Sequence, residues 1–121
     1  MSNKLMVVLL SDTSTHENMG RALHALLYAK QAKDAGMDVK LIFDGGGVEW
    51  AAKLADKEHQ MHELYKELLD SGVIEGVCAF CSEAFEVETK LKETEVSFVD
   101  EDEGHPNVGK RIANDWQILI I

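Results

Sequence analysis

Five short apolar runs recur along the 121-residue chain, and longer segments with helical spacing separate them. The runs cover residues 5–10, 39–43, 73–77, 96–99 and 116–121. Between the first two runs, apolar side chains from Met19 to Ala29 follow one another at close to the spacing of an amphipathic helix. This alternation of strand-like and helix-like segments predicts an α/β fold in which helices cover a parallel sheet.

The ends of the predicted helices carry recognisable signals. Ser14 and Glu17 have the spacing of a capping box at the start of the first helix, and Gly36 provides a natural stop. Further helices are expected over residues 54–69, 82–93 and 107–114. Because no internal repeat or linker interrupts the pattern, residues 1–121 are expected to form one domain.

Composition narrows the class of protein. Asp and Glu outnumber Lys and Arg by 22 to 12, which gives a formal net charge of −10, and such a surface repels nucleic-acid backbones. Two cysteines are too few for a disulfide-stapled secreted scaffold. The apolar run over residues 5–10 is too short for a signal-peptide core or a membrane span, so we expect a cytoplasmic protein with no membrane partner.

Polar and reactive side chains follow the predicted strands at their carboxyl ends. His16 comes after the first strand, Asp44 after the second, Cys78 and Cys81 after the third, and His105 after the fourth. Right-handed crossovers place all of these ends on one rim of a parallel sheet, where ligands usually bind. We therefore expect the two cysteines to be the reactive pair, with His16, Asp44 and His105 shaping a pocket around them.

Three chemistries remain open for Cys78 and Cys81, which are the only cysteines of the chain. One thiolate could carry sulfur as a persulfide, the pair could cycle between dithiol and disulfide, or both could bind zinc together with His16 and His105. The redox alternative is weaker, because the single proline, Pro106, precedes a helix rather than a strand beside the cysteines. Free cysteines are also often simply buried small hydrophobic residues.

The glycine run at residues 45–47 does not indicate a nucleotide site. It lacks the lysine and hydroxyl residue of a P-loop and the spacing of a dinucleotide fingerprint. Glycines at this position more simply let the backbone turn tightly near a neighbour or a small ligand. No cofactor is therefore expected.

The final apolar run suggests an oligomer. Residues 118–121 read Ile-Leu-Ile-Ile, and a strand of this kind at a sheet edge needs cover that another subunit could provide. A central position in the sheet would explain the same residues equally well.

Three stretches together resemble the DsrE/DsrF-like family, including its YchN-like members. They are KLMVVLLSDTSTHENMGRALHALLYAKQAKDAGMDVKLIFDGGGV, GVCAFCSEAFEV and EGHPNVGKRIANDWQILII. The resemblance implies a three-layer α/β/α domain with a five-stranded parallel sheet in the order 4-3-2-1-5, which would make the last strand an edge.

The same resemblance implies a function. Family members with known roles carry sulfur as a cysteine persulfide in sulfur-relay or sulfur-oxidation systems, and commonly assemble as homo- or hetero-oligomers such as trimers and hexamers. By motif position, Cys81 corresponds to the sulfur-bearing residue and Cys78 to its partner. The expected function is a small, sulfurtransferase-like sulfur carrier that exchanges sulfur with donor and acceptor proteins. The alternatives are an oligomeric module that binds a small ligand or zinc at the rim, and a dithiol/disulfide redox protein.

Overall fold

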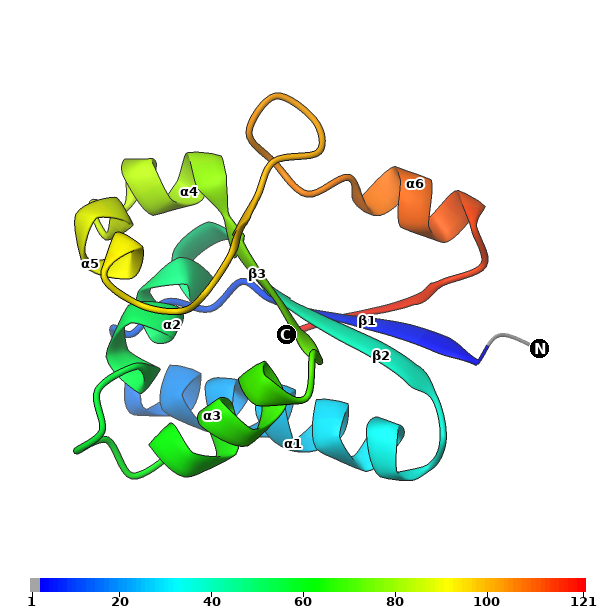
Figure 1. Ribbon diagram of the computed structural model, residues 1–121, viewed down its shortest axis with the longest axis horizontal. Coiled ribbons are helices and arrows are strands. Elements are labelled where there is room, and N and C mark those ends of the chain that lie inside the picture. Colours follow the sequence, from blue (N-terminus) through cyan, green and yellow to red (C-terminus); the bar gives the residue numbers. More distant parts are fainter. Residues whose placement is uncertain (1–2) are drawn as a thin grey trace.

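A five-stranded, all-parallel sheet organises the computed structural model, which describes residues 3–121 (Figure 1). Its strand order is β4-β3-β2-β1-β5, so the predicted α/β class and the predicted order are both confirmed. The strands are β1 (Lys4–Leu9), β2 (Asp38–Phe43), β3 (Ile74–Cys78), β4 (Phe98–Val99) and β5 (Gln117–Ile120). The helices are α1 (His16–Asp34), the 3-10 helix η1 (Gly45–Gly47), α2 (Val48–Leu54), α3 (His62–Asp70), α4 (Ala79–Ala84), α5 (Glu88–Lys92) and α6 (Val108–Ala113).

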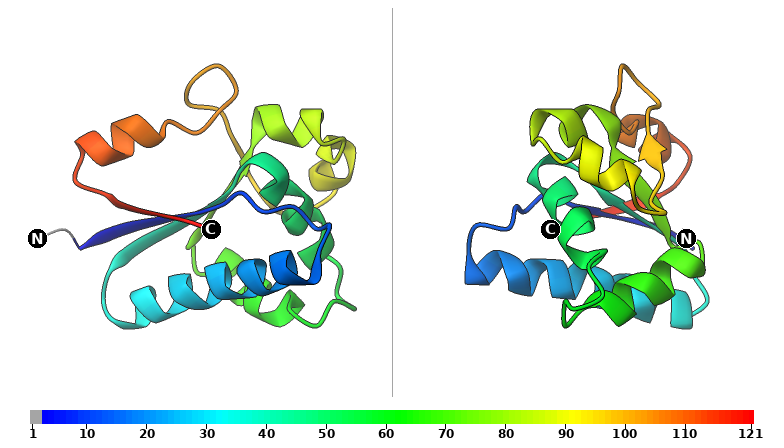
Figure 2. Two further views of the ribbon diagram at one scale, coloured as in Figure 1. Left: turned by 180° about the vertical axis from the view of Figure 1, so that it is seen from behind. Right: turned by 60° about the vertical axis from the view of Figure 1, so that its left-hand side comes forward.

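Successive side chains of the strands supply two apolar layers. Val7 and Leu9 of β1 belong to the main core, which lies on the side of the sheet covered by α1 and α3. Met6 and Val8 belong to a second cluster on the opposite face, together with Ile42, and Val108 of α6 packs against it. The position of α6 over this face can be followed in Figure 2. Because α6 is only six residues long, the second face has much thinner cover than the first.

The two edges of the sheet are unequal. On one side β4 consists of only two residues, which limits the backbone available to another strand. On the other side β5 pairs with β1, and Ile120 near its end leaves 61% of its surface exposed. The final apolar run is therefore an edge strand, as the family resemblance implied.

Three local predictions about the helices were wrong. The helix expected over residues 54–69 begins only at His62, because α2 ends at Leu54 and turns occupy residues 55–61. The first helix is capped by Thr15, whose hydroxyl oxygen accepts a hydrogen bond from the backbone N–H of Asn18 at 3.0 Å, and not by Ser14. The Ser14 hydroxyl instead donates to Asp12 Oδ1 at 2.6 Å. The single helix expected over residues 82–93 is divided into α4 and α5, because Glu86 adopts a left-handed conformation with φ of 60°.

The glycine run shapes the backbone at the carboxyl ends of β1 and β2. Gly45 to Gly47 form η1, and the Asp44 side chain caps it by accepting from the N–H of Gly45 at 2.8 Å. A Cβ atom at Gly47 would overlap with the carbonyl oxygen of Leu9. The glycines thus permit a close approach to a neighbouring strand end, and this turn fixes Asp44 at the rim.

Candidate functional site

Cys78 lies at the corner where strand β3, the neighbour of the edge strand β4, becomes helix α4. It is the last residue of the strand and the N-cap of the helix, and its sulfur accepts a hydrogen bond from the backbone N–H of Cys81 at 3.4 Å. The hydroxyl of Ser82, which is fully buried, donates to the Cys78 carbonyl oxygen at 2.7 Å. The first turn of α4 therefore holds the two cysteines in a fixed relation.

The two thiols have different environments. Both cysteines are free, but Cys78 is completely buried whereas Cys81 is partly exposed. Burial raises the pKa of the Cys78 thiol to about 12, and the hydrogen bond from the Cys81 N–H opposes this increase only in part. Cys81 is consequently the sulfur that a reagent or a partner can reach.

The loop between β4 and α6 completes the surroundings of Cys78. His105 Nδ1 and the Gly104 carbonyl oxygen each lie 3.6 Å from its sulfur. The loop is held against the start of α4, because the backbone N–H of Phe80 donates to the Gly104 carbonyl at 2.8 Å. The Phe80 ring also packs on the His105 ring, with 4.6 Å between the centroids. The imidazole is thus held beside the buried sulfur.

Asp44 approaches the second sulfur from the end of β2. Its Oδ1 accepts from the Cys81 thiol at 3.6 Å. Ligand atoms of Cys78, Cys81 and His105 all lie within 4.8 Å of one another, and these residue types can together hold a soft metal ion. The structure therefore gathers around the sulfurs four of the five side chains that were predicted to meet at the rim.

The fifth predicted residue, His16, has a different position. It is the exposed first residue of α1 and lines a groove of about 920 Å³ with residues that include Tyr28, Gln60 and Ile120. This groove runs along the β5 edge of the sheet, and the cysteines are not among its lining residues. The rim thus divides into a cysteine cluster and a separate groove.

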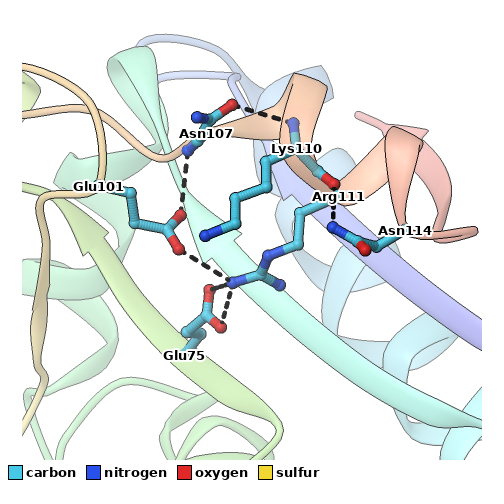
Figure 3. A network of polar contacts seen from close by, with 6 residues as sticks. All are labelled: Glu75, Glu101, Asn107, Lys110, Arg111 and Asn114. Carbon is cyan, nitrogen blue, oxygen red and sulfur yellow. Dashed lines mark hydrogen bonds and ion pairs between the residues drawn. The ribbon is translucent and has the colours of Figure 1, made fainter.

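A charged network beneath the loop was missed by the sequence analysis (Figure 3). Arg111 Nη2 donates to both carboxylate oxygens of Glu75 in β3, at 2.5 and 2.6 Å, and lies 3.6 Å from Glu101 in the loop. Glu101 in turn accepts from the backbone N–H of Asn107 at 3.0 Å. The network ties α6 and the loop that carries His105 to strand β3. A glutamate within the apolar run VIEGV was the one available signal.

A parallel α/β sheet with a thiol pair at the carboxyl end of strand β3 defines the class of this protein. Residues 5–104 match the DsrE/DsrF-like family, and the chain belongs to this family, which is associated with sulfur relay. The family resemblance noted in the sequence is thereby confirmed.

Two further proteins are similar to this chain. An uncharacterized protein of Methanocaldococcus jannaschii, MJ0733, is 28% identical over 102 residues, which make up 84% of this chain and 81% of that protein. The structure of BT1422, a conserved protein of unknown function from Bacteroides thetaiotaomicron, matches with a TM-score of 0.64 and 22% identity over 96% of this chain and 94% of that one. This structural likeness supports the fold.

Residues 3–121 include no helix with the length and apolar character needed to cross a membrane.

Proposed function

We propose that this protein is a sulfur carrier that holds sulfane sulfur as a persulfide on Cys81 and passes it to the thiol of a partner protein. The observation that supports the proposal is the pairing of a reachable thiol with a buried one at the rim of the sheet. A carrier of this kind needs one accessible sulfur and a partner protein, but little other catalytic machinery.

Loading and transfer are two displacement reactions at sulfur. The Cys81 thiolate attacks the outer sulfur of a donor persulfide, so that a new S–S bond forms and the donor leaves as its thiolate. The thiolate of the acceptor protein then attacks the outer sulfur of the Cys81 persulfide, and Cys81 leaves as a thiolate. Neither step requires an external oxidant, because the sulfane sulfur keeps its oxidation state throughout.

The Cys78 thiol can release the bound sulfur from Cys81 when no acceptor is present. Its thiolate attacks the inner sulfur of the Cys81 persulfide, which forms a Cys78–Cys81 disulfide and expels hydrosulfide. A dithiol reductant then restores both thiols. Because burial raises the pKa of Cys78 to about 12, this route is slow at neutral pH and preserves the cargo until an acceptor arrives.

The neighbouring side chains set the conditions at the two sulfurs. Asp44 accepts the hydrogen bond of the Cys81 thiol in the resting protein, and His105 together with the Gly104 carbonyl fixes the position of Cys78. His16 contributes to the adjoining groove, where a donor or acceptor protein would come into contact with the carrier.

A second copy of the chain is the proposed cover for the β5 edge. Leu23 and Tyr28 on α1 are 38% and 42% exposed beside the groove, and Ile120 on β5 is 61% exposed. These side chains form an apolar surface next to an edge strand, which is the arrangement that subunit contacts commonly cover.

The oligomer is tested by light scattering after size exclusion. Ile120→Glu should dissociate the assembly, because it places a charge in the contact. Ile112→Glu is a matched control, since Ile112 is similarly exposed, at 58%, but lies on α6 at the opposite face of the sheet. A monomeric wild-type protein, or equal effects of the two substitutions, would contradict this assignment.

Sulfur carriage is tested by intact-mass analysis after incubation with a sulfane-sulfur donor. The wild-type protein should gain the mass of one sulfur atom, which reducing agents should remove. Cys81→Ser should abolish the gain, whereas Cys78→Ser, the control that removes the other thiol, should retain it. If wild-type protein with titratable thiols stays unmodified, the carrier function is refuted.

A further inference from the structure

The geometry points to a zinc site formed by Cys78 Sγ, Cys81 Sγ and His105 Nδ1, with the carboxylate of Asp44 as the fourth ligand. This site goes beyond sulfur carriage and does not depend on it. It draws on three separate segments, because the cysteines come from the β3–α4 corner, the histidine from the loop after β4, and the aspartate from the end of β2.

The separations between ligand atoms agree with tetrahedral zinc. Zn–S bonds of about 2.3 Å and Zn–N or Zn–O bonds of about 2.1 Å place a sulfur about 3.6 Å from a nitrogen or oxygen on the same ion. Cys78 Sγ is 3.6 Å from His105 Nδ1, and Cys81 Sγ is 3.6 Å from Asp44 Oδ1. Two of the edges of a coordination tetrahedron are therefore already formed.

The other edges among Cys78, Cys81 and His105 require only a small adjustment. The ligand atoms of Cys78, Cys81 and His105 lie within 4.8 Å of one another, about 1 Å beyond the sulfur–sulfur edge of roughly 3.8 Å that tetrahedral zinc sets. Cys81 is partly exposed and lies on the outer side of the cluster, so a change in its side-chain torsion can bring its sulfur inward.

The donor types select the metal. Two thiolates and an imidazole favour zinc, whereas magnesium and calcium prefer ligand sets made of oxygen atoms. Binding displaces the two thiol protons to solvent. Two thiolates and one carboxylate then leave a net charge of −1 around the divalent ion, so the ion balances both thiolate charges that binding creates.

The histidine is positioned before any metal arrives. The backbone N–H of His105 donates to the Asp102 carbonyl at 3.0 Å, and its own carbonyl accepts from the N–H groups of Glu101 and Asp102 at 2.9 Å. The Phe80 ring packs against the imidazole, as described above. Ligands fixed in this way lose little conformational freedom on binding, which favours affinity.

Zinc and cargo sulfur would exclude each other, because both use the lone pairs of the Cys81 sulfur. Cobalt titration of the reduced, metal-free chain therefore tests the site on protein that carries no sulfur. Tetrahedral Co²⁺ bound by thiolates gives charge-transfer bands in the near ultraviolet and strong visible bands, and zinc should displace it with a stoichiometry of one ion per chain. Sulfur loading is measured separately, by mass on metal-free protein, so failure of one property is distinguishable from failure of the other.

Substitutions of single residues test which side chains bind the zinc ion. Cys78→Ser and His105→Gln should each lower the affinity for zinc at least about 10-fold and change the cobalt spectrum. His105→Gln retains both cysteines and keeps the test valid if Cys78→Ser does not fold. His24→Gln removes an exposed histidine on α1 as a control and should leave the titration unchanged. Absence of tetrahedral bands, or bands that persist in His105→Gln, would overturn the site.

Discussion

The backbone N–H of Cys81 donates a hydrogen bond to the sulfur of Cys78, so the two cysteines share one helical turn although only Cys81 reaches solvent. The cysteine that begins the helix is thus the buried one, and the cysteine one turn further on is the exposed one. The C-x-x-C spacing alone does not indicate which of the two thiols is reactive. Their difference in burial does, because only the exposed thiol can react with a partner.

Alkylation should distinguish the two thiols. Burial raises the pKa of the Cys78 thiol to about 12, so this thiol stays protonated at pH 8, and its burial also blocks the reagent. Iodoacetamide should therefore modify Cys81 first in the native protein, and peptide mapping should find Cys78 unmodified until the chain is unfolded. Rapid modification of Cys78 in native Cys81→Ser protein would contradict the burial of that thiol.

Gly47→Ala should destabilise the fold strongly. The added methyl group would meet the carbonyl oxygen of Leu9, a backbone atom that cannot move aside without displacing β1. We expect a loss of at least about 2 kcal/mol in the free energy of unfolding, measured in urea.

Gly20→Ala is the matched control for this substitution. Gly20 lies within α1, and a Cβ atom there would have no neighbouring atom within 4 Å. Because alanine restricts the unfolded chain more than glycine does, this change should stabilise the protein by about 0.5–1 kcal/mol. Equal losses from both substitutions would show that the contact with Leu9 is not the cause.

Arg111→Met should loosen the loop that carries His105. The substitution leaves the half-buried carboxylate of Glu75 without its cation and should cost about 1–3 kcal/mol. Hydrogen exchange at the amides of Gly104 and His105 should also become faster, because Glu101 loses one of its contacts with α6.

Lys110→Met is the control for the network, since Lys110 is exposed and its ammonium group makes no ion pair within residues 3–121, although its side chain extends toward Glu101 (Figure 3). It should change neither stability nor exchange appreciably. Adding Glu75→Gln to Arg111→Met should recover part of the lost stability, because the carboxylate is then no longer charged. Independent, additive losses would argue against the pairing.

Tyr65→Phe should make the protein less sensitive to alkaline pH. Burial raises the pKa of Tyr65 to about 12, above its value of about 10 in the unfolded chain. Since the folded state holds the proton more tightly, this stability is complete below pH 10 and is lost as the pH rises from 10 to 12. Unfolding in urea at a series of pH values should show a shallower decline for the variant than for wild type.

The same substitution should not harm the protein at neutral pH. The Tyr65 hydroxyl is buried and finds no hydrogen-bond partner within residues 3–121, so its removal relieves an unsatisfied polar group. We expect the free energy of unfolding at pH 7 either to stay the same or to increase by up to about 1 kcal/mol. A clear loss of stability at pH 7 would show that the hydroxyl makes a favourable contact.

The sequence predicted the α/β class because the strands are short apolar runs and the helices between them are periodic. It also predicted that Asp44, Cys78, Cys81 and His105 would converge, since parallel strands bring their carboxyl ends to one rim. The position of His16 beside a separate groove could not be inferred, because topology assigns a residue to a rim and does not say on which side of the sheet it lies.

Other features of the structure were not predicted from the sequence, because they depend on contacts that the sequence pattern does not reveal. The Glu75–Arg111 pair joins positions that are 36 residues apart, and nothing local to Arg111 indicates its partner. Thr15 caps α1 although Ser14 has an equally suitable side chain, because Asp12 has already engaged the Ser14 hydroxyl. The left-handed Glu86 that separates α4 from α5 has no glycine to signal it.

The loop between β4 and α6 contributes no strand to the sheet, yet it supplies Gly104 and His105 to the cysteine cluster. Relatives with the same sheet and a different loop would therefore keep the sulfur pair while losing the imidazole beside it. Diversification within this architecture can proceed by exchange of a single surface segment, so the length and sequence of that segment offer a practical criterion for sorting homologues by chemistry.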